Sequence, residues 1–303
     1  MKVSGFSYIR NGFSYDYPFI ESICSALAVC DEFIIAVGNS TDGTREAIEA
    51  IGSEKIRIID TVWDENLREG GKMFAMQANI GLDAIDGDWG FHIQADELIH
   101  EDEAQIIRAE MEKYLHDKAV EGIVFDFYHF YGGYDLIGTT RRWHRREVRV
   151  VRNNPLIRSY RDSQGFRIYP SVEKYQSGHK GRSLRVAKSR AHIYHYSYAR
   201  NPISMRKKDS YFHTFWHDDN WLKQNLSKQK EYDYHNIDDL SLFTGTHPEW
   251  MKTRISKKDW TFTFDRSRAK FSSAKYRFLY FIEKATGWRI GEYRNYRIIR
   301  SSI

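Results

Sequence analysis

The segments GGKMFAMQANIG (residues 70–81) and GDWGFHIQADE (residues 87–97) carry the clearest structural signals in this chain of 303 residues. The first predicts a helix that opens at two glycines. The second predicts a turn and then a buried strand over 89–93, which ends at two adjacent carboxylates, Asp96 and Glu97. Open α/β sheets bind ligands just beyond the carboxyl ends of their strands. Carboxylates there suit a divalent cation that neutralises phosphate charge, although they would equally well cap a helix beginning near Glu101.

Strands and helices alternate in the first 130 residues, as judged from the spacing of apolar side chains. The predicted strands are 3–9, 32–37, 56–62, 89–93 and 122–130, and the predicted helices are 18–29, 44–51, 73–84 and 101–117. Strands separated by helices of about ten residues indicate βαβ units. The sequence therefore predicts an α/β fold, with a mostly parallel mixed sheet flanked by helices.

The pattern changes in the second half of the chain. From about Arg141 it consists of short, basic pieces of strand type, at 147–152, 166–169 and 192–198. Beyond residue 201 the chain reads as helical and aromatic to its end. We therefore expect a catalytic or binding domain at 1–200 and a helical, basic and aromatic C-terminal extension at 201–303.

The composition indicates a folded protein with an anionic partner. Apolar residues make up 41% and aromatic residues 15% of the chain, which favours a packed core over disorder. The net charge is +5, and the basic residues concentrate in 141–190 and 252–300. Such asymmetry favours nucleotide phosphate, a lipid headgroup or nucleic acid as partner. The apolar runs are far too short to span a bilayer and no signal peptide is visible, so a cytoplasmic location is expected.

The loop Asn39-Ser-Thr-Asp-Gly-Thr44 lies between a predicted strand and a predicted helix. Its free backbone N–H groups would face the ends of the strands, as nucleotide binding requires, although the same residues are common in ordinary turns. No Gly-x-Gly-x-x-Gly follows the first strand, and no Walker-type Gly-Lys-Ser/Thr loop is present. These absences count against dinucleotide and P-loop nucleotide binding.

Taken together, these motifs resemble the nucleotide-sugar domain of family 2 glycosyltransferases, which have the GT-A fold. An Arg-Asn pair follows the first strand, Ser-Thr-Asp-Gly-Thr follows the second, and Gln-x-Asn-x-Gly, Gly-Asp-Trp and x-Ala-Asp-Glu come in that order. The later segments Val148–Arg152, Ser171–Glu173 and Ile193–Tyr198, followed by Lys207, resemble the bacterial branch that builds lipopolysaccharide core and related glycans. The resemblance covers about residues 3–215.

The resemblance implies an inverting glycosyltransferase that moves a sugar from a nucleoside diphosphate to a glycan or lipid-linked acceptor of the cell-surface polysaccharide type. Asp96 would contact Mg²⁺ or Mn²⁺ at the donor diphosphate, and His195 would complete the metal shell or touch the phosphates. Glu173 would remove the proton of the acceptor hydroxyl, because a protonated sugar hydroxyl is a poor nucleophile. On spacing alone, Glu173 fits a surface position equally well, and His195 fits a strand histidine packed among tyrosines.

The resemblance also implies which residues line the donor site. They are Arg10, Asn11, Ser40, Asp42, Lys72, Gln94 and Ala95. Two positions depart from the family pattern. Gln94 stands at the first position of the Asp-x-Asp motif, where an amide is a weaker metal ligand than a carboxylate, and Gly38 stands where many relatives carry an acid that reads the base. The sequence therefore leaves open both the base and strict dependence on a metal.

Two other functions fit parts of the sequence. A nucleotidylyltransferase of related fold would need a glycine-rich, basic loop after the first strand, which Arg10-Asn-Gly-Phe13 matches poorly. A nucleic-acid-binding protein would use the basic, aromatic C-terminal half. The cluster Arg141–Arg146 would grip phosphate or lie in solvent. The tail at 270–300 would lie on an anionic membrane surface, giving peripheral association near a lipid-linked acceptor, or it would pack on the catalytic domain.

Overall fold

The computed structural model describes residues 1–226 and 228–299, so Arg300, at the end of the basic tail, lies outside the described residues. Its strands are β1 Val3–Ile9, β2 Glu32–Val37, β3 Ile56–Asp60, β4 Trp89–His92, β5 Glu97–Leu98, β6 Gly122–Tyr131, β7 Leu136–Gly138, β8 Arg146–Arg152, β9 Ile157–Ser159, β10 Phe166–Ile168, β11 Arg182–Tyr198, β12 Leu240–Leu242 and β13 Tyr296–Ile298. Its helices are α1 Phe19–Ala26, α2 Thr44–Glu49, α3 Lys72–Asp83, α4 Glu101–Lys113, α5 Val172–Gln176, α6 Pro202–Thr214, α7 Asp219–Asn225, α8 Lys252–Ser256 and α9 Ala274–Thr286, with short 3-10 turns at Glu249–Met251 and Arg266–Arg268.

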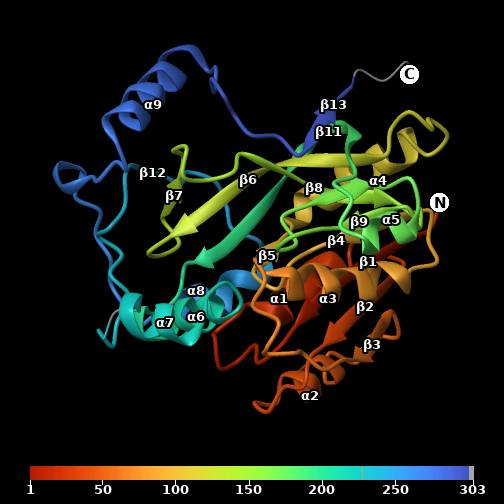
Figure 1. Ribbon diagram of the computed structural model, residues 1–303, viewed down its shortest axis with the longest axis horizontal. Helices are drawn as coiled ribbons and strands as arrows, with labels where there is room; N and C mark the ends of the chain where they lie inside the picture. Colours follow the sequence, from red (N-terminus) through yellow and green to blue (C-terminus); the bar gives the residue numbers. More distant parts are fainter. Residues whose placement is uncertain (227, 300–303) are drawn as a thin grey trace.

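The strands form one curled sheet, in the order β3-β2-β1-β4-β8-β6-β11-β10-β9 (Figure 1). The pairs β2–β3, β1–β2, β1–β4 and β6–β11 are parallel, whereas β8 runs antiparallel between β4 and β6. The predicted α/β class, with a mostly parallel sheet flanked by helices, is confirmed. The five strands predicted in the first 130 residues are present, with ends that differ by two residues or fewer.

Apolar side chains of the sheet alternate between two cores. Phe33, Ile35 and Val37 of β2 belong to a core that is closed by α1, α2 and α4. Ile34, which points to the opposite face, belongs to a second core with α3, β9, β10 and β13. Because successive residues of a strand point to opposite faces, the continuous apolar run at 33–37 buries both faces of β2. The central strands are therefore covered on both sides, and ligands can reach the sheet only at its edges or ends.

Helix α3 begins where the double glycine predicted it. Gly70 and Gly71 have positive φ angles, of 54° and 71°, and Gly71 is the N-cap of the helix. A left-handed backbone is easily adopted only by glycine. A Cβ at Gly71 would also lie 2.6 Å from the Cβ of Asp162, so this position holds the start of α3 against the loop that follows β9.

The region beyond residue 200 contains the predicted helices but also returns to the sheet. β13 pairs in parallel with β11 at the register Leu184↔Tyr296, and β12 pairs with β7. Local periodicity did not show this pairing, because a three-residue strand takes its conformation from its neighbour. The division near residue 200 stays a prediction, and both sides of it pack on β11.

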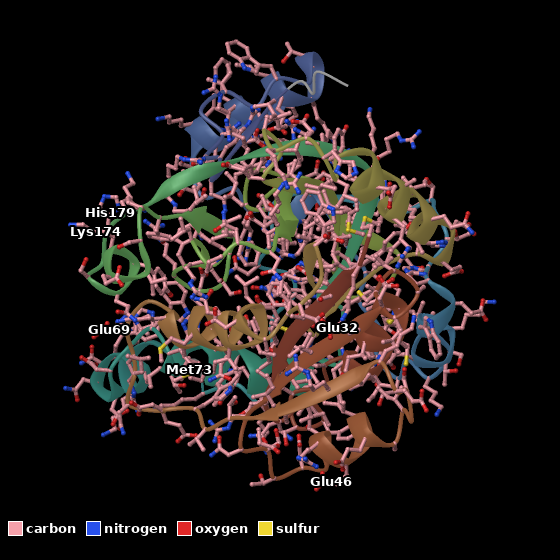
Figure 2. The ribbon with its side chains drawn as sticks, turned by 90° about the vertical axis from the view of Figure 1, so that its right-hand side faces the viewer. Glu32, Glu46, Glu69, Met73, Lys174 and His179 are labelled. Carbon is pink, nitrogen blue, oxygen red and sulfur yellow. The ribbon has the colours of Figure 1, made fainter. Side chains whose placement is uncertain are left out.

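At the outer edge of the molecule, Lys174 of α5 and His179 in the following loop point away from the body (Figure 2). Among the described residues, no helix is both long and apolar enough to cross a membrane.

Candidate active site

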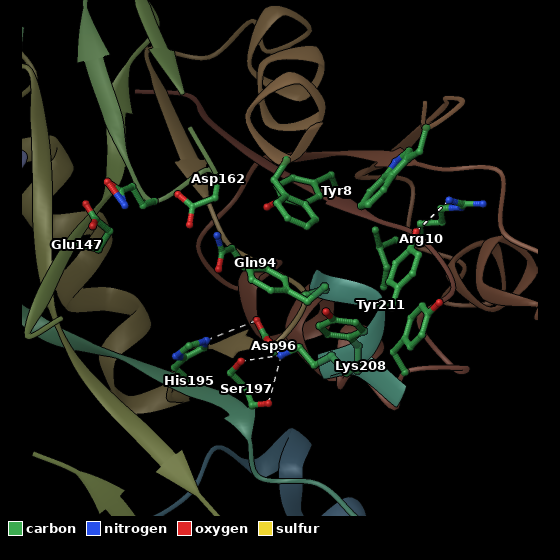
Figure 3. A pocket seen from close by; sticks show the side chains of 18 of the residues that line it. Tyr8, Arg10, Gln94, Asp96, Glu147, Asp162, His195, Ser197, Lys208 and Tyr211 are labelled. Carbon is green, nitrogen blue, oxygen red and sulfur yellow. Dashed lines mark hydrogen bonds and ion pairs between the residues drawn. The ribbon is translucent and has the colours of Figure 1, made fainter. Parts of the chain in front are cut away.

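A cavity of about 330 Å³ lies beyond the carboxyl ends of β1 and β4 (Figure 3). This size is at the lower end of the range of small-molecule sites. Its lining comes from β1, β8, β11, α3, α6 and the loops after β1, β3, β4, β7 and β9. The lining residues are Tyr8, Ile9, Arg10, Tyr15, Tyr17, Trp63, Phe74, Gln94, Ala95, Asp96, His144, Glu147, Arg149, Asp162, Gln164, His195, Ser197, Lys208, Tyr211 and Phe212. Five of the ten residues assigned from the resemblance line this cavity, namely Arg10, Gln94, Ala95, Asp96 and His195, and the other five do not.

Asp96 is the centre of a buried charge cluster. Its carboxylate lies 3.0 Å from Nζ of Lys208, 3.6 Å from a guanidinium nitrogen of Arg200 and 3.7 Å from Nε2 of His195. Burial opposes the charge of Asp96, but Lys208, His195 and Arg200 together hold the pKa of this carboxyl well below its ordinary value. A lysine and an arginine thus face one carboxylate in a buried site. Such an excess of positive charge favours an anionic ligand.

Lys208 reaches the cavity from α6, far along the chain from Asp96. The helix begins at Pro202, and the side chain of Asn201 caps it by accepting a hydrogen bond from the backbone N–H of Ile203. Its register turns Lys208 inward, where it also donates to the hydroxyl of Ser197, while Lys207 is exposed. Burial and the nearby charge of Arg200 lower the pKa of Lys208 to about 8, although Asp96 opposes this shift.

His195 lies on β11 and is oriented by a second histidine. Its Nδ1 is 2.8 Å from Nδ1 of His129, and Nε2 of His129 is 2.7 Å from the carbonyl oxygen of His144. Burial lowers the pKa of all three imidazoles. Neutral rings donate from one nitrogen and accept at the other. The contact with His129 therefore leaves Nε2 of His195 facing Asp96, as a hydrogen-bonding or metal-binding nitrogen.

A divalent cation at Asp96 would find two protein ligands. Oδ1 of Asp96 and Nε2 of His195 are 3.7 Å apart, near the roughly 3 Å expected between two ligands at right angles on one ion. Among the described residues, no group of three His, Cys, Asp or Glu side chains is arranged to hold a metal. Mg²⁺ commonly takes one or two protein ligands and completes its shell with substrate phosphates and water. The donor set therefore fits a cation that a phosphate ligand helps to hold.

Glu97 has a structural contact that the sequence did not reveal. Its two oxygens accept hydrogen bonds of 2.7 Å and 2.6 Å from the guanidinium of Arg149, and both residues are almost fully buried. Helix α4 is capped instead by His100, which accepts from the backbone N–H of Asp102. The interpretation of Asp96 and Glu97 as helix caps was therefore wrong. Glu97 neutralises Arg149 beneath the cavity, and Asp96 faces the cavity itself.

Asp162 is a second carboxylate in the wall of the cavity, and the sequence analysis did not single it out. Its Oδ1 is buried and has no hydrogen-bond partner among the described residues. Burial raises the pKa of this carboxyl, and hydrogen bonds from backbone N–H groups together with the charge of Arg161 only partly offset that effect. The residues on either side, Arg161 and Ser163, have positive φ angles of 55° and 62°. Non-glycine residues adopt this conformation at a cost of order 1–3 kcal/mol, and such strain clusters at functional sites.

The other end of the cavity is aromatic. The rings of Tyr15 and Tyr211 stack, with centroids 4.5 Å apart and planes 10° from parallel. Arg10 donates a hydrogen bond of 2.9 Å to the hydroxyl of Tyr211 and forms an ion pair of 2.7 Å with Glu65. Flat rings beside a guanidinium suit a planar heterocycle. This end of the cavity therefore offers a surface for a nucleobase.

The structure explains the glycine at position 38. A Cβ there would lie 2.7 Å from Nε1 of Trp63 and 2.9 Å from the Cβ of Arg10. The indole of Trp63 thus occupies the space that an acidic side chain would need. Nε1 of Trp63 and Nε of Arg10 are both buried without a hydrogen-bond partner among the described residues. Unpaired buried donors are rare in folded proteins and point to a missing ligand or water.

Several residues expected at the donor site hold the loops around it instead of lining the cavity. The hydroxyl of Ser40 accepts from the backbone N–H of Asn11, and Oδ1 of Asn11 accepts from the N–H of Thr41. The carboxylate of Asp42 accepts from the N–H groups of Ser14 and Thr44, and these bonds, opposed by burial, lower its pKa. Arg10, Gln94 and Ala95 do line the cavity. The direct roles expected of Asn11, Ser40 and Asp42 stay predictions.

Lys72 and Glu173 do not line the cavity. Lys72 is exposed at the start of α3 and lies 3.4 Å from Glu69. Glu173 is exposed on α5, in the edge segment that carries Lys174, and a hydrogen bond with Ser171 lowers its pKa. A general base has to reach the hydroxyl that it deprotonates. Glu173 as base stays a prediction, and its position does not favour it.

Glu147 lines the cavity, and the protonation of its carboxyl affects the stability of the folded protein. Burial raises the pKa of its carboxyl from 4.5 to about 7, although it accepts a 2.9 Å hydrogen bond from Asn295. The unfolded chain loses this proton near pH 4.5, and the folded chain loses it only near pH 7. The free energy of unfolding therefore falls as the pH rises between these two values. The full shift corresponds to roughly 3 kcal/mol. We expect Glu147→Gln to be more stable than wild type above pH 7 and equally stable below pH 4.5. Urea unfolding at several pH values measures this, and parallel profiles for the two proteins would contradict it.

Comparisons with known proteins add only distant structural neighbours. No protein-family model matches the chain. No curated protein matches it either. Among solved structures, S. aureus TarS 1-349 in complex with UDP matches with 20% identity and a TM-score of 0.31, over 43% of this chain and 36% of that one. The mannosyltransferase PcManGT from Pyrobaculum calidifontis, in complex with GDP-Man and Mn²⁺, matches with 19% identity and a TM-score of 0.30, over 40% and 34%.

A third match is glucosyl-3-phosphoglycerate synthase from Mycobacterium tuberculosis, in complex with Mn²⁺, UDP and phosphoglyceric acid. It has 18% identity and a TM-score of 0.28, over 44% of each chain. In each case the chain covers well under two thirds of the matched protein's length. Scores this low assign neither a family nor an activity to the chain.

Proposed function

We propose that the protein is a glycosyltransferase of GT-A type that moves a sugar from a nucleoside diphosphate to a glycan or lipid-linked acceptor. The observation that carries this proposal is the cavity at the ends of β1 and β4, where Asp96 is surrounded by Lys208, Arg200 and His195. An anion-binding cluster at one end and stacked aromatic rings at the other match the two halves of a nucleoside diphosphate. The motif order that resembles family 2 enzymes supports the same assignment.

In this proposal, the diphosphate lies against Lys208, with the base near Tyr211 and Arg10. Arg200 is buried beside Asp96 and adds positive charge from behind the cavity wall. Lys208 and Arg200 stabilise the negative charge that develops as the bond from the anomeric carbon to the diphosphate oxygen breaks. A divalent cation held by Asp96 and His195 would neutralise further charge on the departing diphosphate. Gln94, which lines the cavity beside Asp96, would donate to a ribose or sugar hydroxyl.

We assign the general base to Asp162. Its carboxylate is half-buried and has one buried, unpaired oxygen at the cavity wall, whereas Glu173 is exposed on α5. The acceptor hydroxyl transfers its proton to Asp162 while its oxygen attacks the anomeric carbon and the diphosphate leaves. A single displacement of this kind inverts the configuration at that carbon. The raised pKa of Asp162 makes it a stronger base than an exposed carboxylate.

Thermal-shift measurements with a panel of nucleoside mono-, di- and triphosphates test this function. A ligand that binds only the folded protein raises its melting temperature. We expect a nucleoside diphosphate to give the largest shift, and incubation with the matching sugar nucleotide to release free sugar slowly by hydrolysis. Stronger binding of a triphosphate with release of pyrophosphate would instead support a nucleotidylyltransferase. Binding of oligonucleotides without binding of any nucleotide would overturn the proposal.

The role of the metal has its own prediction. We expect Mn²⁺ to increase the melting shift given by the nucleoside diphosphate, and Asp96→Asn to abolish that increase, because the amide is a poorer ligand for a hard cation. The metal and the nucleotide are each measured alone as controls. If the nucleotide shift is the same in EDTA and in Mn²⁺, Lys208 and Arg200 carry the diphosphate without a metal.

A further inference from the structure

Helix α9 presents an aromatic face to solvent. Phe278 and Phe281 on the helix are 65% and 51% exposed, and Trp288, just beyond its end, is 66% exposed. Phe278 and Phe281 are three residues apart, and residues three or four apart lie on the same face of a helix. Large apolar side chains gathered on one exposed face mark an interaction surface more often than chance.

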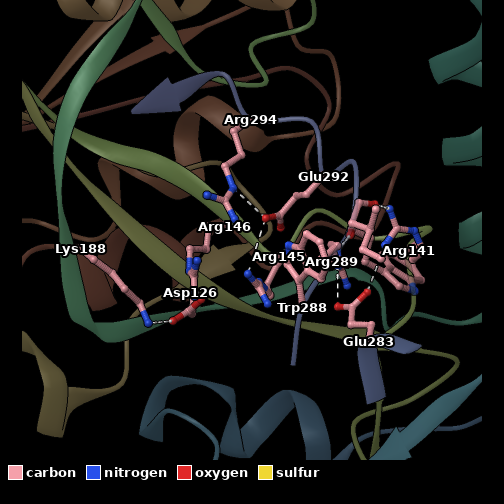
Figure 4. Close-up of polar contacts among 12 residues, drawn as sticks. Asp126, Arg141, Arg145, Arg146, Lys188, Glu283, Trp288, Arg289, Glu292 and Arg294 are labelled. Atoms are coloured by element: carbon pink, nitrogen blue, oxygen red, sulfur yellow. Dashed lines mark hydrogen bonds and ion pairs between the residues drawn. The ribbon is translucent and has the colours of Figure 1, made fainter. Parts of the chain in front are cut away.

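The opposite face fixes the helix to the body of the protein. Tyr280 is buried, and its hydroxyl donates a 2.7 Å hydrogen bond to Asp239. Glu283 accepts from Arg289 at 2.6 Å and lies 3.5 Å from Arg141 (Figure 4). Ser273 caps the start of the helix, and Gly287 ends it with a positive φ of 70°. The aromatic face is therefore held outward by contacts on the inner face, at the periphery of the molecule (Figure 1).

Cationic side chains flank the aromatic face. Lys275 and Arg277 are exposed on either side of Phe278, and neither forms an ion pair with another described residue. Lys270, shortly before the helix, is exposed and also lacks an acidic partner in the described part of the chain. A helix whose apolar face is bordered by unpaired lysine and arginine is typical of proteins that lie at an anionic lipid surface.

A basic cavity lies beside the same helix. It has a volume of about 590 Å³, and Arg141, Arg142 and Lys270 line it together with Tyr276 and Tyr280 of α9. Asp238 contributes one carboxylate to this lining and Arg141 pairs with Glu283, so Arg142 and Lys270 leave an excess of positive charge. Guanidinium groups match the geometry of phosphate oxygens. The cavity is thus suited to a phosphate group that approaches along α9.

We propose that α9 docks the protein on the surface of an anionic phospholipid bilayer. Phe278, Phe281 and Trp288 enter the boundary between headgroups and acyl chains, and Lys275 and Arg277 meet anionic headgroups. The cavity beside α9 takes one lipid phosphate at Arg142 and Lys270. This inference does not depend on the proposed glycosyltransferase activity, because none of these residues lines the cavity at Asp96. It fixes which face of the protein meets the membrane.

Co-sedimentation of the full chain with vesicles tests this proposal. We expect binding to vesicles that contain phosphatidylglycerol, little binding to vesicles of phosphatidylcholine alone, and weaker binding in high salt, since the electrostatic part is screened. The double variant Phe278→Ser/Phe281→Ser should lower the vesicle partition coefficient about tenfold or more, because it has no aromatic rings at these positions to insert into the bilayer. Lys275→Glu with Arg277→Glu should lower it by at least as much, at about fivefold for each cation removed.

Trp250→Ser is the matched control, because Trp250 is a comparably exposed aromatic residue, at 51%, away from α9. It should bind vesicles like wild type. All variants change exposed side chains, so unchanged melting temperatures verify that each one is folded. Equal binding by the Phe278/Phe281 variant and the Trp250 variant would overturn the proposal. So would equal binding to neutral vesicles, or a wild-type dimer that the Phe278/Phe281 variant converts to monomer without any effect on vesicle binding.

Discussion

Asp162→Asn is expected to lower kcat for sugar transfer by about 10²- to 10⁴-fold, the usual contribution of a general base. The amide keeps the size of the side chain and cannot accept the hydroxyl proton. Binding of the nucleoside diphosphate should change little, because Lys208, Arg200 and the aromatic wall are untouched. The measurements are steady-state kinetics with the sugar nucleotide and acceptor, together with calorimetric binding of the nucleotide. Loss of nucleotide affinity in parallel with kcat would show that Asp162 binds the donor instead.

The variant Glu173→Gln tests Glu173 as the alternative general base. The resemblance to family 2 enzymes gives this residue the role of base, whereas the structure leaves it exposed on α5 and outside the cavity. If Asp162 is the base, Glu173→Gln should cost less than tenfold in kcat, roughly what a peripheral contact contributes. A large loss in Glu173→Gln together with full activity in Asp162→Asn would return the role to Glu173. It would also require α5 to move toward the cavity when the acceptor binds.

Lys208→Met is expected to raise the Kd of the nucleoside diphosphate about a hundredfold, equivalent to ~3 kcal/mol. The substitution removes the ammonium group nearest Asp96 and keeps the length of the side chain. Asp96 would still lie near Arg200 and His195, so the variant should fold. Lys208→Arg, which keeps the charge, should recover part of the affinity. Calorimetry or equilibrium dialysis with the preferred nucleotide gives the result.

Lys207→Met is the control for this variant. It removes the same charge from the adjacent position of the same helix, but Lys207 is exposed and does not line the cavity. Its effect on Kd should therefore lie within about threefold, as expected for a screened surface charge. Equal losses in the two variants would mean that the general positive charge of α6, and not a contact from Lys208, attracts the nucleotide.

Local patterns in the sequence predicted most of the secondary structure in the N-terminal half of the chain. Apolar spacing located β1, β2 and β4, and the double glycine located the start of α3. These features depend on neighbours within a few residues, because each side chain's face is set by the period of its own strand or helix. The same reasoning placed Asp96 at the end of a central strand, and the structure shows it at the cavity.

Other site residues could not be found from local patterns. Asp96 and Lys208 are 112 residues apart, and the sequence does not show which turn of α6 faces the strand ends. Asp162 lies in a short loop between β9 and β10. The feature that marks it as a candidate is the positive φ angle of the residue on each side, and no sequence motif predicts these angles. The basic stretch at 141–146 gave a weak signal, and Arg141 proved to pair with Glu283 of α9.

By itself, the sequence determined the α/β class, the positions of the central strands and the carboxylate at the end of β4. The physical reason is that secondary structure follows from side-chain spacing along a short segment. Only the tertiary structure decided which charges meet at Asp96, that Glu97 is neutralised by Arg149 and that Glu173 lies outside the cavity. Such contacts depend on strand order and helix register, which are fixed by the packing of the whole core and not by any one segment.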